Sequence, residues 1–148
     1  MSEVKTKVNE ASVAKFLDSI PDEGQRSDSR VLLELMQKAT KTEPKMWAGT
    51  IVGFGTHHWV DKHGRQGDWC LAGFSPRNQT LALFMLGGWD QESELLAKLG
   101  QHSLRQEILS IKRLDDVNGP ALTRLIGAAL KRAKKIAQAE AKKQVKSA

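Results

Sequence analysis

The sequence has very little cysteine and no long apolar segment. Only one of its 148 residues is a cysteine, Cys70, so no disulfide can form within the chain. A free thiol suits a reducing compartment, and we therefore expect a cytoplasmic protein. No apolar run approaches the ~20 residues that a membrane span requires, so we expect no membrane partner. The first twelve residues carry acids and lack an apolar core, and we expect no secretion signal there.

The basic residues are concentrated toward one end of a chain whose length fits a single domain. The net charge is +6, and 8 of the 23 Lys and Arg residues follow position 123, together with one acid, Glu140. We interpret this end as a solvated helix face and tail. An alternative that we favour less is binding of nucleic acid through Lys131, Arg132, Lys134, Lys135, Lys142, Lys143 and Lys146.

Apolar spacing predicts two helices at the start of the chain. Apolar side chains recur at helical spacing from Val13 to Ile20, and a turn is expected at 21–24. A second helix is expected to begin near Ser27 or Asp28 and to end before Pro44. Its apolar stripe is Val31, Leu32, Leu35, Met36 and Ala39.

The middle of the chain has the composition of β-strands. We predict strands at 46–60, 68–75, 80–86 and 107–112, with a hairpin loop at 61–67. The strand at 80–86 is apolar on both faces, which favours a central place in the sheet. Between the last two strands we expect a short helix that Asp90 caps and Gly100 ends.

The last helix has the clearest pattern. Pro120 fits its first turn, and an apolar stripe continues to Ala137. Residues 138–148 lose large apolar side chains except Val145, so we expect a frayed basic tail after a domain at 1–137. The predicted fold is α+β, a single-domain sandwich in which helices pack an antiparallel sheet, with the order α-α-β-β-β-α-β-α.

Familiar chemical motifs fit the middle segment poorly. Gly53 and Gly55 form a GxG, but no third glycine or helix follows to hold a phosphate. His57 and His58 point to opposite faces of a strand and cannot share one ion from one side. Cys70 lies mid-strand among apolar residues, where a thiol is usually inert. No catalytic residue is assigned, and no cofactor is evident.

Glycine and tryptophan share one face of the predicted strand at 46–60. In regular alternation this face shows Trp47, Gly49, Ile51, Gly53, Gly55, His57 and Trp59. Either aromatic rings, most plausibly Trp69, pack over the glycines, or the face is an open groove for a small apolar or planar ligand. The candidate ligand-binding residues are Trp47, Gly53, Gly55, His57, Trp59, Asp68, Trp69 and Arg77.

Four blocks of the sequence resemble the YdhG-like family, a domain of unknown function. Within residues 26–132 they read, in order, MWAGTIVGFGTHHW, GRQGDWCLAGFSPRNQTLALFML, LLAKLGQHS and ILSIKRLDDVNGPALTRLI. The resemblance implies a compact α+β domain. Because some members are described as frataxin-like iron chaperones, it also implies iron as an alternative ligand. Such binding relies on an acidic helix ridge, whereas the acids here are interspersed with bases: Asp18, Asp22, Glu23, Asp28 and Glu34.

Three functions therefore stay open at this point. The first is a non-catalytic binding module that uses the glycine and tryptophan face for a small ligand or a protein. The second is a frataxin-like iron-binding protein, which the resemblance alone implies. The third is a weak nucleic-acid binder that uses the basic last helix.

Overall fold

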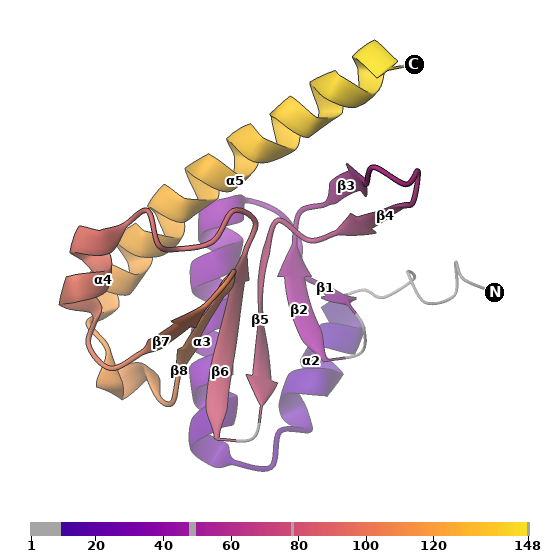
Figure 1. Ribbon diagram of the computed structural model, residues 1–148. Coiled ribbons are helices and arrows are strands. Elements are labelled where there is room, and N and C mark those ends of the chain that lie inside the picture. Colours follow the sequence, from indigo (N-terminus) through magenta and orange to yellow (C-terminus); the bar gives the residue numbers. More distant parts are fainter. Residues whose placement is uncertain (1–9, 48–49, 78, 148) are drawn as a thin grey trace.

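The computed structural model of the protein is an antiparallel sheet with its helices packed on one face (Figure 1). It describes residues 10–47, 50–77 and 79–147, with side chains for residues 13–139 of those ranges. This arrangement confirms the α+β class. The helices are α2 (Glu10–Asp18), α3 (Glu23–Thr40), α4 (Ser93–Leu99) and α5 (Gly119–Ser147), with a 3-10 turn η1 (Leu114–Asp116) before α5.

Six strands form the main sheet, and two more form a projecting hairpin. The order in the main sheet is β1 (Lys45–Trp47), β2 (Ile51–Phe54), β5 (Ala72–Arg77), β6 (Thr80–Met85), β8 (Ile108–Ile111) and β7 (Ser103–Arg105). The hairpin consists of β3 (His57–Val60) and β4 (Gln66–Trp69). The doubly apolar strand β6 lies between β5 and β8, as its composition predicts.

The single strand predicted at 46–60 is wrong, because the structure divides it into β1, β2 and β3. Gly55 has a φ of +74°, a left-handed conformation that interrupts a strand. The strand predicted at 68–75 is likewise divided into β4 and β5. Pairing of Gly53 with Gly73 and of His57 with Trp69 keeps one register across the interruption. The hairpin β3–β4 therefore continues β2–β5 after a change of direction.

Several helix ends differ from the predicted ones. Helix α3 begins at Glu23, four residues before the expected start, because the Asp22 carboxylate accepts a 2.7 Å hydrogen bond from the Gln25 amide. Helix α4 begins at Ser93, so the predicted cap by Asp90 is wrong. Gly100, with a φ of +112°, ends α4 as predicted.

Helix α5 continues to Ser147 and so includes most of the segment from residue 138 that was expected to be a frayed tail. The Asn118 side chain accepts a 2.9 Å hydrogen bond from the Ala121 amide at the start of the helix. The predicted stripe is buried from Leu122 to Ala133. Alanine-rich and lysine-rich segments have high helix propensity, which accounts for continuation without large apolar side chains.

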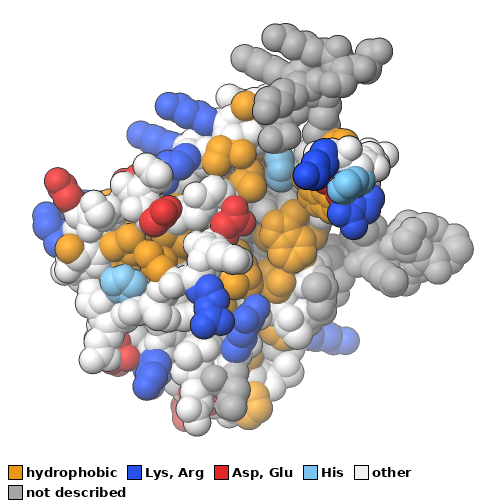
Figure 2. Space-filling view, in the orientation of Figure 1, with side chains coloured by type: hydrophobic (Ala, Val, Ile, Leu, Met, Phe, Trp, Pro, Cys, Tyr) orange, Lys and Arg blue, Asp and Glu red, His pale blue; other side chains and the backbone are white. Residues whose placement is uncertain are grey.

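The core lies between the helices and one face of the sheet. Val52, Phe54 and Phe74 project from the sheet, and Leu32 and Leu125 project from α3 and α5 to meet them. Trp89 is fully buried, and its indole N–H donates to the Glu107 carbonyl at 3.1 Å. Among the described residues no helix covers the opposite face, which is turned toward the viewer in Figure 1. In Figure 2 this face shows separate apolar groups with Lys and Arg among them.

Candidate functional site

Trp47 fills the space above Gly53 on the uncovered side of the sheet. A Cβ added to Gly53 would lie 2.5 Å from Trp47 Cδ1 and 2.7 Å from the Cβ of Cys70. Packing of an aromatic ring over Gly53 is therefore confirmed, although the ring comes from Trp47 and not from Trp69. No open groove lies above Gly53, because the indole occupies that space.

Trp69 extends the aromatic contact beyond Trp47. The two ring centroids are 5.9 Å apart and the ring planes meet at 63°, an edge-to-face arrangement. The indole Nε1 of Trp47 is buried and has no hydrogen-bond partner within the described part of the chain. Trp47 and Trp69 themselves are half-buried. The contact thus joins strand β1 of the main sheet to strand β4 of the hairpin.

Cys70 belongs to this packing and not to a reactive centre. Its side chain is buried, and burial raises the pKa of the thiol to about 12. The thiol therefore stays protonated at neutral pH, and a protonated thiol is a poor nucleophile. The inert role expected for this cysteine agrees with its environment.

The structure does not show Gly53, Gly55 and Gly49 under one aromatic surface. A Cβ on Gly55 would lie 2.8 Å from Leu71 Cδ1, so an aliphatic side chain covers this position. The aromatic ring predicted over Gly55 is therefore wrong, and its positive φ gives a separate reason for glycine. Gly49 lies outside the described residues.

Trp59 packs over Gly67 on the projecting hairpin. A Cβ added to Gly67, its cross-strand partner, would lie 2.9 Å from Trp59 Cζ2 and 3.1 Å from Cε2. The indole thus covers Gly67, and Trp59 is 38% exposed to solvent. Strand alternation puts Trp69 on the same hairpin face. We call Trp47, Trp59 and Trp69 the tryptophan surface.

His57 shares the hairpin face of Trp59 and Trp69, and Asp68 does not. His57 is buried at the start of β3, where it pairs with Trp69. Asp68 lies on the other hairpin face and bonds to His58, with Nδ1 and Oδ1 2.8 Å apart. The second ring nitrogen of His58 lies 2.9 Å from the Gln66 amide oxygen. The hydrogen bond to Asp68, with that to Gln66, raises the pKa of His58.

Arg77 is remote from the tryptophans, at the far end of β5. Its guanidinium carbon lies 5.5 Å from the ring centroid of Phe84, a cation–π distance. Gly73 on β5 pairs with both Gly53 and Phe84. Arg77 follows Gly73 by four residues on β5 and therefore lies on the same face of the sheet. The eight candidate residues therefore form one aromatic surface and several separate contacts.

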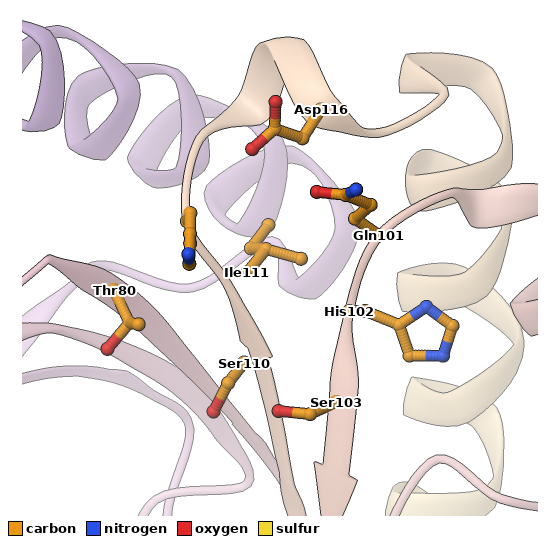
Figure 3. Close-up of a pocket in the computed structure, with 8 residues that line it drawn as sticks. Thr80, Gln101, His102, Ser103, Ser110, Ile111 and Asp116 are labelled. Atoms are coloured by element: carbon orange, nitrogen blue, oxygen red, sulfur yellow. The ribbon is translucent and has the colours of Figure 1, made fainter.

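The structure has a further cavity that no sequence motif indicated. It has a volume of about 230 Å³ and lies where the ends of β6, β8 and β7 meet the η1 turn (Figure 3). Its lining residues are far apart in sequence, and strand β7 was not predicted at all. The sheet order β6-β8-β7 brings them together.

Within the described part of the chain, no three His, Cys, Asp or Glu side chains gather closely enough to hold a metal ion. Among the described residues, no helix combines the length and apolarity needed to cross a bilayer. Comparison with known proteins found no matching family model, no matching curated protein and no matching solved structure.

Proposed function

We propose that the chain is a non-catalytic binding module that recognises an apolar or planar group through the tryptophan surface. The observation that carries this proposal is the packing of the Trp59 indole on Gly67, with Trp59 38% exposed. Because Gly67 already holds part of the indole in place, the exposed part can contact a ligand at little conformational cost. Trp69 shares this hairpin face and adds apolar area beside it.

A dye-binding experiment tests this surface. The planar probe is anilinonaphthalene sulfonate, with its emission followed by direct excitation so that loss of a tryptophan does not remove the signal. Trp59→Ala should weaken probe binding by severalfold. The matched control is Leu104→Ala, because Leu104 on strand β7 is also 38% exposed. Equal weakening by both variants, or by neither, would reject the tryptophan surface as the binding site.

A second candidate is weak binding of single-stranded nucleic acid. Helix α5 contacts strand β3, so the hairpin that carries Trp59 lies beside a helix with exposed Lys131, Lys134 and Lys135. Stacking on an aromatic ring together with phosphate contacts to lysine is the usual means of binding single strands. This proximity supplies the aromatic partner that the sequence did not reveal near the basic helix.

Anisotropy of a labelled oligothymidine at several salt concentrations tests the second candidate. Binding should weaken steeply with salt, and Lys134→Gln with Lys135→Gln should reduce the salt slope. Trp59→Ala should weaken binding with the slope unchanged. Anisotropy that stays flat at low salt would eliminate this candidate while leaving the dye experiment unaffected.

We also propose membership of the YdhG-like family, with its implied iron role as an alternative. Support comes from the four sequence blocks, which correspond to β1–β3, β4–β6, the region from α4 to β7, and the region from β8 into α5. Calorimetry with Fe²⁺ tests the iron alternative. A cytoplasmic location is proposed from the single cysteine.

A further inference from the structure

Three hydroxyl side chains line the cavity at the β6–β8–β7 end of the sheet. Ser103 pairs with Ser110, Ser110 pairs with Ala82, and Thr80 lies two residues before Ala82. Strand alternation therefore puts all three hydroxyls on the uncovered face of the sheet. Figure 3 shows Ser103 and Ser110 side by side, with Gln101 and Asp116 on the opposite wall.

Backbone contacts join the two segments that form the wall with Gln101 and Asp116. Gly100 forms an antiparallel bridge with Val117, and the Asn118 amide donates to the Leu99 carbonyl at 2.7 Å. A Cβ on Gly100 would lie only 2.6 Å from the Asp116 carbonyl oxygen. The segment with Gln101 is thus fixed against the η1 turn with Asp116, and the cavity does not depend on a side-chain contact.

Two opposite charges accompany the hydroxyls. Lys112 follows β8, and alternation puts it on the same face as Ser110, while Asp116 ends the η1 turn. Each is exposed, and the two do not form an ion pair. A purely anionic ligand meets repulsion from Asp116, and a purely cationic one meets repulsion from Lys112. A ligand with both charges gains from both side chains.

The polar side chains of the cavity are not used by the protein itself. Within the described residues, no hydrogen bond or ion pair engages the side chains of Thr80, Gln101, Ser103, Ser110, Lys112 and Asp116. His102 differs, because its Nδ1 lies 2.7 Å from the Gly100 carbonyl oxygen and its ring points away from the cavity in Figure 3. Convergent polar groups in a concave site are typical of small-ligand binding.

We propose that this cavity binds a small zwitterion of the free α-amino acid class. The ligand carboxylate would contact Lys112 and the hydroxyls, and its ammonium group would contact Asp116. A volume of about 230 Å³ equals the share of roughly eight water molecules at ~30 Å³ each, which leaves room for a free amino acid. The site is separate from the tryptophan surface and does not rest on the function proposed there.

Titrations followed by ¹H–¹⁵N NMR test this site on the full chain. The probes are glycine, L-serine, L-glutamine and L-leucine, each added separately. Acetate and methylammonium each carry one of the two charges, and glycerol carries hydroxyls alone. At least one amino acid should give saturable shifts at 101–103, 110–112 and 116, whereas the three fragments should give no saturable shift there.

Charge-removing variants give the second part of the test. Lys112→Gln and Asp116→Asn should each weaken amino acid binding by about tenfold, as loss of a charge-assisted contact does. Lys98→Gln, an exposed lysine of α4 outside the cavity, should leave affinity unchanged. The proposal is overturned if no amino acid gives saturable shifts, if a single fragment binds as well, or if the shifts cluster elsewhere. The wild-type titration alone can overturn the proposal, so the test remains decisive even if a variant fails to fold.

Discussion

Trp47 lies over Gly53 so closely that the glycine hydrogen faces the edge of the indole. The Cβ position of Gly53 is 2.5 Å from Cδ1 and 2.7 Å from Nε1 of this ring. Real Cβ atoms do not approach other heavy atoms to this distance, so any side chain there must displace the ring or the strand. The contact joins the short edge strand β1 to β2 and gives glycine a definite packing role.

Gly53→Ala should destabilise the protein. Overpacking of this kind typically costs ~1–3 kcal/mol, although alanine in an unobstructed strand is normally neutral or better than glycine. Urea unfolding followed by tryptophan emission measures the change. The control is Gly127→Ala in α5, where a Cβ would meet nothing within 4 Å. It should raise stability by up to about 1 kcal/mol. Wild-type stability of Gly53→Ala would show that Trp47 moves without cost.

Gly55→Ala should also destabilise, but for a different reason. Alanine at a φ of +74° is strained by about 1–2 kcal/mol, and its Cβ would also lie 2.8 Å from Leu71. The two causes separate in a double variant measured by urea unfolding. In the Leu71→Ala background, substitution of Gly55 should still cost stability, because the backbone strain persists. Complete loss of the effect in that background would assign it to the side-chain contact alone.

Comparison of sequence and structure shows which interactions a pattern can reveal. Burial of Leu122 to Ala133 follows from helical spacing, and the central place of β6 follows from apolar residues on both faces. The break at Gly55 was missed because glycine spacing alone does not distinguish a covered position from one with positive φ. The early start of α3 at Glu23 depends on one side-chain bond from Asp22.

The candidate site was harder to predict than the fold. An aromatic ring over Gly53 was correctly predicted, but the ring is that of Trp47 on β1, which the prediction had put in the same strand as Gly53. Asp68 and Arg77 were also named as candidates, but Asp68 lies on the other face of the hairpin and Arg77 at the far end of β5. The cavity near Ser110 requires knowledge of strand β7, whose three residues, including Leu104, are all exposed and lack a buried face that would mark a strand.

The imidazole of His58 should titrate above its ordinary pKa of 6.5. Its hydrogen bond to Asp68 is the largest cause, and the bond to Gln66 comes second. A raised folded-state pKa means that the contact stabilises the hairpin below pH 6.5 and that this contribution is lost as pH rises through the folded pKa. In NMR titrations, Asp68→Asn should lower the His58 pKa more than Gln66→Ala does. The reverse order would contradict the assigned causes.

The Cys70 thiol should resist modification in the native protein. Its pKa of about 12, raised by burial, leaves very little thiolate at pH 8, and the side chain is 1% exposed. Labelling by iodoacetamide should therefore be slow in buffer and fast in denaturing urea, as mass spectrometry can follow. Gly53→Ala provides a sensitive comparison, because its added methyl group presses on the Cβ of Cys70. That variant should label faster. Rapid native labelling of the wild type would show that the packing around Cys70 opens readily.

The ion pair between Asp28 and Arg113 should matter more than that between Asp18 and Arg30. Asp28 Oδ2 accepts from Arg113 Nε at 2.8 Å and from the Leu114 amide at 3.1 Å, which joins α3 to the segment after β8. The Asp28 side chain is 10% exposed, whereas that of Asp18 is 66% exposed. A buried acceptor with two donors cannot be replaced by water as easily as a surface carboxylate can.

Asp28→Asn and Asp18→Asn therefore form a matched pair, because each removes one charge without changing side-chain size. Loss of the Asp28 carboxylate should cost about 1.5–3 kcal/mol, since a charged acceptor is removed and an amide replaces it. Loss of the Asp18 carboxylate should cost less than about 1 kcal/mol, as exposed pairs usually do. Urea unfolding at low and high salt measures the loss of unfolding free energy in both variants. Added salt should reduce the loss in Asp18→Asn more than the loss in Asp28→Asn. Similar costs for the two variants would mean that Asp28 is solvated in solution and that its two donors find other partners.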